Sequence, residues 1–207
     1  LPAAGIGLIH DARERLMNPH SGLYNALSVS VAGGKLGGDG DFWVVRHDFR
    51  AYIPAGERHI LHANALTRFR PGTIPGYELY HIGGVNSLRS FQPDPDICGQ
   101  HEVLATLEYR FEFFANRQIS LFGMHGYYGL QAVIGNDHAF YWLPDDSFDE
   151  GRHLSSVFIG LHLLVPVLDR VRVEFGCNGY DRADRSIRFG LNVGWYEKAY
   201  TQGRRVR

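Results

Sequence analysis

The stretch Leu107-Glu108-Tyr109-Arg110-Phe111-Glu112-Phe113 alternates strictly between apolar and charged residues. Successive side chains of a β-strand point to opposite faces, so this period of two places all the apolar residues on one face and all the charged residues on the other. The pattern predicts a strand that separates an apolar environment from a polar one. It does not say which of the two environments is the interior of the fold.

The same alternation recurs along the chain, and no stretch has convincing helical periodicity. It predicts roughly nine strands of about 9–13 residues, near the length that crosses a bilayer when a strand is tilted. The predicted strands begin near Ile6 and extend to Trp195, within the ranges 6–13, 23–31, 45–53, 61–69, 107–113, 119–128, 157–165, 171–175 and 189–195.

The predicted connections alternate between short turns and long loops. The turns are 17–22, 54–57, 115–117 and 166–169, and the loops are 33–41, 71–100, 134–153 and 179–186. In an up-and-down meander every second connection lies on the same side, so one rim carries turns and the other carries loops. This asymmetry is typical of outer-membrane barrels.

Bulk composition limits the function classes. The chain has 207 residues, which predicts a single domain over 1–207, and its 21 basic and 22 acidic residues give a net charge of −1. This balance offers no basis for nucleic-acid binding. No apolar run reaches the length of a transmembrane helix. The 25 glycines and 13% aromatic residues fit many strands joined by tight turns.

Two barrel classes share this alternation. A soluble ligand-binding barrel turns its apolar face inward, whereas a membrane barrel turns it toward lipid. Aromatic residues close to predicted turn and loop ends are typical of the two interfacial belts of a membrane barrel, which favours the second class. They are Phe42, Trp43, Phe113, Phe114, Trp195 and Tyr196.

Two motifs and the strand after them resemble a known family. Residues 7–14 (GLIHDARE) followed by 18–22 (NPHSG) are similar to a strand-turn motif of the bacterial surface antigen superfamily, the BamA/TamA-type outer-membrane assembly and secretion proteins. Residues 83–91 (GGVNSLRSF) resemble the family loop that folds back into the lumen, and 107–111 (LEYRF) resemble the next strand. The motif residues are Asp11, Arg13, Glu14, Pro19 and Gly22 for the turn, and Gly83, Gly84, Leu88, Arg89, Ser90 and Phe91 for the loop.

The resemblance implies an all-β, transmembrane, antiparallel up-and-down barrel of about eight, or nine, strands. It corresponds to the C-terminal part of the family barrel, without periplasmic domains in this chain. The implied location is the bacterial outer membrane, in contact with its lipid. The implied role is assembly or translocation of other outer-membrane or secreted proteins, or membrane anchoring, with no catalytic residue, metal or cofactor.

Arg89 is the residue to which the resemblance gives a specific role. It implies that this arginine anchors the loop to the inner barrel wall, with Glu108 as an acidic neighbour. The family aspartate on the following strand is replaced here by Met124, so Glu112 or Asp48 are the substitutes we expect. Ser90 stands where the family has glycine, which predicts a different local turn.

The odd strand count leaves two ways to complete the sheet. Bacterial single-chain barrels close with an even number of antiparallel strands. Either residues 1–16 do not form a full strand and eight strands close, or the chain pairs with upstream strands or with a second copy.

Two alternatives remain at the level of sequence. The first is a small lipid-modifying enzyme that uses Ser156 or Ser120 with His125 or His162, although no nucleophile-elbow motif is present. The second is the soluble ligand-binding barrel. A zinc site from His10, His20, His47 and His59 is disfavoured because these residues are scattered over turns and both faces. Cys98 and Cys177 lie toward one rim, and whether they pair is left open.

Overall fold

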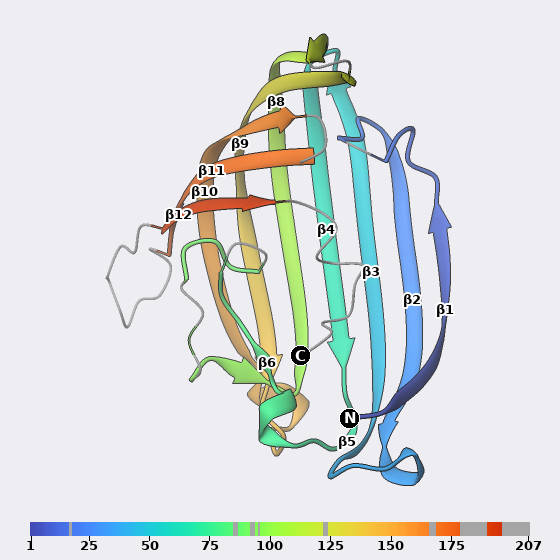
Figure 1. Ribbon diagram of the computed structural model, residues 1–207. Coiled ribbons are helices and arrows are strands. Elements are labelled where there is room, and N and C mark those ends of the chain that lie inside the picture. The colour runs from blue at the N-terminus through green and yellow to red at the C-terminus, as the bar shows by residue number, and fades with distance from the viewer. Residues whose placement is uncertain are drawn as a thin grey trace.

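The computed structural model describes residues 1–16, 18–84, 87–91, 94, 96–121, 124–165, 169–178 and 190–195. One antiparallel sheet follows the chain in the order β1-β2-β3-β4-β8-β9-β10-β11-β12, and the short β5 pairs with β3 (Figure 1). The predicted up-and-down meander is therefore confirmed. The long strands are β1 (Ala3–Asp11), β2 (Gly22–Gly33), β3 (Asp41–Gly56), β4 (His59–Phe69), β8 (His101–Leu121), β9 (Met124–Trp142), β10 (Arg152–Val165), β11 (Asp169–Cys177) and β12 (Gly190–Trp195).

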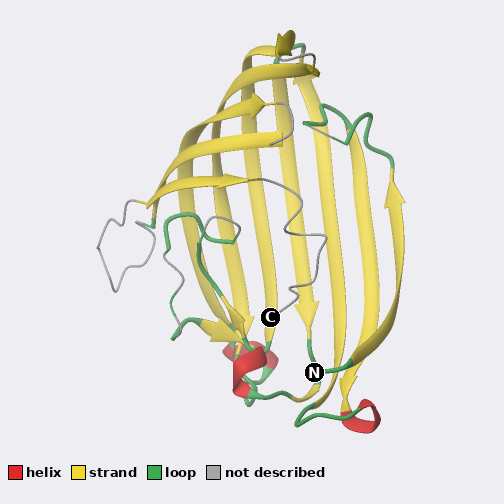
Figure 2. Ribbon diagram, viewed as in Figure 1, coloured by secondary structure: helices red, strands yellow, loops and turns green. Residues whose placement is uncertain are grey.

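Small elements lie between the long strands. A separate two-stranded ribbon joins β6 (Tyr80–His81) to β7 (Cys98–Gly99), and β5 covers Gly72–Thr73. The single-turn helices η1 (Gly34–Leu36), η2 (Gly76–Glu78) and η3 (Phe148–Glu150) all lie at the rim that carries the long loops (Figure 2). Nowhere in the described ranges is there a helix long and apolar enough to cross a membrane.

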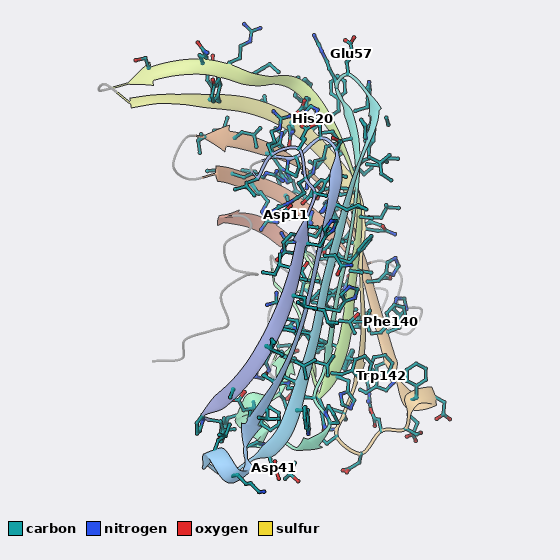
Figure 3. The ribbon with its side chains drawn as sticks, turned by 90° about the vertical axis from the view of Figure 1, so that its right-hand side faces the viewer. Asp11, His20, Asp41, Glu57, Phe140 and Trp142 are labelled. Atoms are coloured by element: carbon teal, nitrogen blue, oxygen red, sulfur yellow. The ribbon has the colours of Figure 1, made fainter. Side chains whose placement is uncertain are left out.

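The two rims differ as predicted from the lengths of the connections. Asp41, at the end of one long loop, and Glu57, in a tight turn, lie at opposite ends of the sheet (Figure 3). We call these ends the loop rim and the turn rim. The predicted turn at 166–169 and the predicted loop at 179–186 fall almost entirely outside the described residues.

Two predicted connections have the wrong bounds. Residues 115–117 belong to β8, which continues to Leu121, and residues 134–142 belong to β9. Both places carry polar residues. The strands nevertheless continue, because Asp137 points to the polar interior in phase with the alternation, and because the β8–β9 hairpin runs past its neighbours.

Burial decides which face is the interior. In β8 the Leu107 side chain is 55% exposed, whereas Glu108 is 2% and Arg110 is 0% exposed. In β10 and β11 the outward residues Ile159 and Phe175 are likewise exposed, and the inward charges are buried. A soluble barrel has the opposite polarity. Apolar side chains on the outside of a charged interior require lipid around the sheet.

The sheet has two edges, β1 and β12, and no pairing joins them within the part of the chain that the structure describes. Residues 3–11 of β1 pair along their whole length with β2, so the N-terminal segment contains a full strand. The alternative in which residues 1–16 do not form a full strand and eight strands remain is therefore wrong, and nine strands are present in the meander among the described residues.

Candidate functional site

The segment between β4 and β8 turns back against the concave face of the sheet (Figure 1). Gly83 and Gly84 have φ angles of 122° and 86°, in the region that favours glycine. The Gly83 N–H donates to Ser87 Oγ at 2.7 Å, and the Gly84 N–H donates to the Phe91 carbonyl at 2.7 Å. These bonds close a compact loop, and Arg89 lies inside it. Val85 and Asn86 lie outside the described residues.

Apolar side chains fix this loop to the sheet. Ile82 and Leu88 are fully buried, and Phe91 is 8% exposed. They belong to one cluster with wall residues of β4, β8 and β9, namely Leu66, Leu104, Ala139 and Tyr141. These wall residues form an apolar patch on an inner face that also carries many buried charges, and the loop packs on that patch.

Arg89 reaches three acidic residues on three strands. Its Nη1 lies 3.0 Å from Glu108 Oε2 of β8 and 3.0 Å from Glu174 Oε1 of β11. Its Nε lies 3.5 Å from Asp137 Oδ2 of β9, and its backbone N–H donates to the same oxygen at 3.3 Å. The guanidinium also lies over the Phe158 ring of β10, 3.6 Å from the centroid. One side chain thus connects the loop to four adjacent strands.

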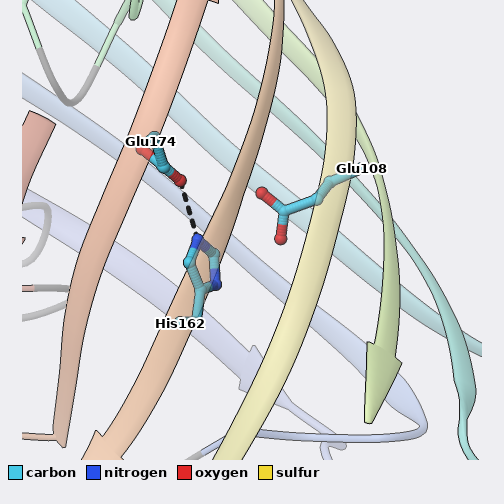
Figure 4. A group of neighbouring side chains, drawn as sticks. All are labelled: Glu108, His162 and Glu174. Carbon is cyan, nitrogen blue, oxygen red and sulfur yellow. Dashed lines mark hydrogen bonds and ion pairs between the residues drawn. The ribbon is translucent and has the colours of Figure 1, made fainter. Parts of the chain in front are cut away.

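A second set of contacts surrounds these carboxylates. Arg110 Nε donates to Glu108 Oε1, and His162 Nε2 lies 2.7 Å from Glu174 Oε1 (Figure 4). All these groups are nearly inaccessible to solvent. Isolated buried charges are very costly, so the cluster is stable only while each charge retains its partners.

Glu108, His162 and Glu174 also have the ligand types of a transition-metal site, with ligand atoms within 4.8 Å of one another. Two features oppose a metal here. Arg89 Nη1 already lies between the two carboxylates. His162 Nδ1 faces Arg170 Nη1, which can only donate, so Nε2 carries the proton that points to Glu174 and has no lone pair for a metal. The geometry describes an ion-pair cluster.

The other predicted partners of Arg89 make contacts elsewhere. Asp48 pairs with Arg50 at 2.9 Å and with Arg46 at 3.3 Å. Glu112 accepts hydrogen bonds from Asn18 at 2.9 Å and from Gln131 at 2.6 Å. Sequence reasoning missed Asp137, which fell in a predicted loop, and Glu174, whose proximity depends on the registers of four strands.

Ser90, which replaces the family glycine, packs against Gly176 of β11. A Cβ atom built at Gly176 would lie 2.7 Å from the Ser90 backbone nitrogen, so only glycine fits this wall position. The loop backbone therefore approaches β11 directly beside the Arg89 contacts.

The predicted strand-turn motif forms a turn stabilised by its own side chains. Asp11 and Arg13 form a two-point ion pair at 2.7 and 2.8 Å, and Glu14 accepts from Ser21 Oγ at 2.9 Å. Gly22 opens β2 with a φ of 107°, and Pro19 is buried. Asn18 was not predicted as a site residue.

Asn18 projects from that turn into the interior, where it is 5% exposed. Its amide donates to Glu112 of β8, and its oxygen accepts from Gln131 of β9 and Arg170 of β11, both at 3.0 Å. A second group of buried polar contacts thus crosses the interior near the turn rim.

Among the residues whose side chains the structure describes, no serine lies beside a free histidine in the way that the enzyme alternative requires. Ser156 and His162 lie six residues apart on β10, about 20 Å along the strand, and His162 is bound to Glu174. Ser120 pairs in register with His125, whose side chain is outside the described residues. Cys98 and Cys177 are both free thiols.

Comparison with known proteins agrees with this geometry. A family model described as the Omp85 superfamily domain matches residues 3–195. A curated relative, the outer membrane protein assembly factor BamA of Nitratidesulfovibrio vulgaris (strain Hildenborough), is 27% identical over 124 residues. That match covers 53% of this chain but 16% of the relative, so the chain spans only a small part of the length of that protein.

Proposed function

Because the chain belongs to the Omp85 superfamily, we propose that it is part of an outer-membrane β-barrel that promotes the assembly of other proteins into the bacterial outer membrane, or their translocation across it. The outward apolar face contacts outer-membrane lipid. Residues 1–207 act as one barrel domain, the C-terminal part of the family barrel. The curated relative is named as an assembly factor, which supports the same role here.

The observation that carries the proposal is the set of buried ion pairs between Arg89 and the inner face of the sheet. A loop anchored through a buried arginine to β8, β9 and β11 couples the loop rim to the middle of the sheet. The role we propose acts through contacts with polypeptides.

An assembly assay tests this role. The protein, reconstituted in vesicles of bacterial outer-membrane lipid, is mixed with a urea-unfolded outer-membrane porin, and heat-modifiable migration of the porin on a gel measures its folding. We expect faster folding with the native protein than with empty vesicles, and a loss of most of that acceleration with Arg89→Ala. Arg152→Ala, which removes an exposed ion pair with Asp146, is the matched control and should leave the acceleration intact.

An unchanged folding rate with the native protein would reject the assembly role. In that case the barrel would serve as a membrane anchor, a role that predicts retention of a fused soluble protein on vesicles without any effect on porin folding.

A further inference from the structure

The β8–β9 hairpin is longer than its neighbours at the turn rim. β8 has 21 residues and β9 has 19. β4 pairs with β8 only as far as Phe111, and β10 pairs with β9 only as far as Gly129. The two strands of the hairpin continue to pair with each other to Leu121 and Met124. The end of the hairpin is therefore a two-stranded ribbon that extends past the rest of the sheet (Figure 1).

Aromatic residues mark where this ribbon leaves the membrane. Phe113 and Tyr127 are 47% and 58% exposed, and the rings of Phe114 and Tyr128 meet edge to face at 5.7 Å. Such residues gather at membrane–water interfaces. Polar, exposed Gln118 follows them toward the tip. The end of the ribbon therefore lies in water, on the side of the short turns, which is the periplasmic side in outer-membrane barrels.

Two irregularities direct the ribbon. The register between β8 and β9 shifts between Glu112 and Phe114 and again between Phe114 and Arg117. Bulges of this kind bend a strand pair and change its direction. Figure 3 shows the yellow-green hairpin turned across the end of the sheet instead of continuing along the strands.

The outer edge of β8 has no partner strand beyond this bend among the described residues. Within the described part of the chain, the last backbone hydrogen bond on that side runs from the Glu112 N–H to the Arg58 carbonyl, at 2.9 Å. The edge from residue 113 to residue 121 is about 30 Å long at the rise of a β-strand. Charged residues and prolines are the usual features that prevent pairing at an exposed edge. Residues 113–121 contain one charged residue, Arg117, and no proline, so little prevents pairing here.

An alternating row of backbone donors and acceptors is complementary to another extended backbone, because a lipid headgroup or a helix cannot supply the matching ladder. We propose that the outer edge of β8, from Phe113 to Leu121, binds an extended polypeptide segment by strand addition at the turn rim. The proposal rests on the proposed function only for the source of that segment, a chain that awaits assembly into the membrane.

Hydrogen exchange with a defined peptide tests the proposal. The probe is a synthetic peptide with the sequence of residues 152–165, a membrane-strand sequence of this chain, and its control is the same peptide with proline at every second position. In detergent micelles, we expect the first peptide to slow amide exchange in residues 113–121 but not in residues 101–111. Equal protection by the control, or no protection by either peptide, would overturn the proposal.

Two double variants separate strand addition from side-chain docking. In a strand, alternate residues direct their N–H groups to opposite sides, so Arg117→Pro/Ile119→Pro and Gln118→Pro/Ser120→Pro remove donors on different sides of β8. The double variant that removes the N–H groups pointing away from β9 should weaken peptide binding about tenfold or more, while the amides that pair β8 with β9 stay protected. Binding unaffected by both pairs would refute strand addition.

A third arm tests the membrane as the occupant. If residues 113–121 become protected in lipid nanodiscs without peptide, the bilayer surface covers this edge and the proposal is wrong. These measurements use no assembly activity. If the protein binds the peptide but does not accelerate porin folding, the proposed function is rejected and the peptide-binding site at β8 stands.

Discussion

Replacing Arg89 with alanine should destabilise the fold more than any other single change to a charged residue of the loop. Arg89 Nη1 lies 3.0 Å from the carboxylates of Glu108 and Glu174, which are 2% and 0% exposed. Removing one partner of a buried ion pair typically costs about 3–5 kcal/mol, because the remaining charges stay desolvated without compensation. The lost contact with the Phe158 ring acts in the same direction.

The assay is equilibrium unfolding in guanidinium chloride with the protein in lipid vesicles, followed by tryptophan fluorescence. We expect Arg89→Ala to lower the free energy of unfolding by about 3–5 kcal/mol. Arg89→Lys should lower it by less, because an ammonium keeps the charge but cannot contact both carboxylates with a planar fork. The exposed Arg152→Ala is the control and should have a far smaller effect. Equal losses for Arg89→Ala and Arg152→Ala would show that the buried contacts of Arg89 contribute no more to stability than an exposed ion pair.

Three further changes test other parts of the structure. Gly176→Val should displace the loop, since even a Cβ would lie 2.7 Å from the Ser90 nitrogen, and should expose residues 87–91 to hydrogen exchange; Gly76→Val, where nothing lies within 4 Å, should not. Leu88→Asp should release the loop to protease because it places a charge in the apolar cluster, and an unchanged cleavage pattern would contradict this account of loop docking. At the loop rim, hydrogen bonds from the Ser147 N–H and hydroxyl lower the pKa of Glu150 below its ordinary 4.5. Because the pKa is lowered, the Glu150 carboxylate stabilises the η3 cap at pH values above its ordinary pKa, and this stabilisation is lost as the pH falls and the carboxylate is protonated. The Ser147 amide resonance should therefore shift below about pH 4.5 in the native protein and not in Glu150→Gln.

The fold was largely predictable because one physical rule, the alternation of side chains across a strand, acts along the whole chain. It placed Leu107 and Glu108 on opposite faces, and the family motifs then indicated which face meets lipid. The same rule also explains where the prediction of strand ends failed. A polar residue inside a strand, such as Asp137, looks like a loop signal unless its phase with the inner face is followed.

The site was less predictable because it depends on registers. Glu108 was expected beside Arg89, and the structure places the two side chains together, although the functional role of this contact stays a prediction. Glu174 is 85 residues from Arg89, and only the pairing of β8, β9, β10 and β11 brings it into reach. Asn18 was missed because a turn residue is ordinarily solvated, whereas this one, with a φ of 45°, points into the interior.

The apolar face of the sheet meets lipid, while the charged face lines the interior. Spin labels at single cysteines along residues 157–165, in a protein with Cys98→Ser and Cys177→Ser, test this arrangement most directly through collision rates with dissolved oxygen in a bilayer. We predict maxima at the outward residues Val157, Ile159, Leu161 and Leu163 and minima between them. Maxima at Phe158, His162 and Leu164, or no alternation, would contradict the account.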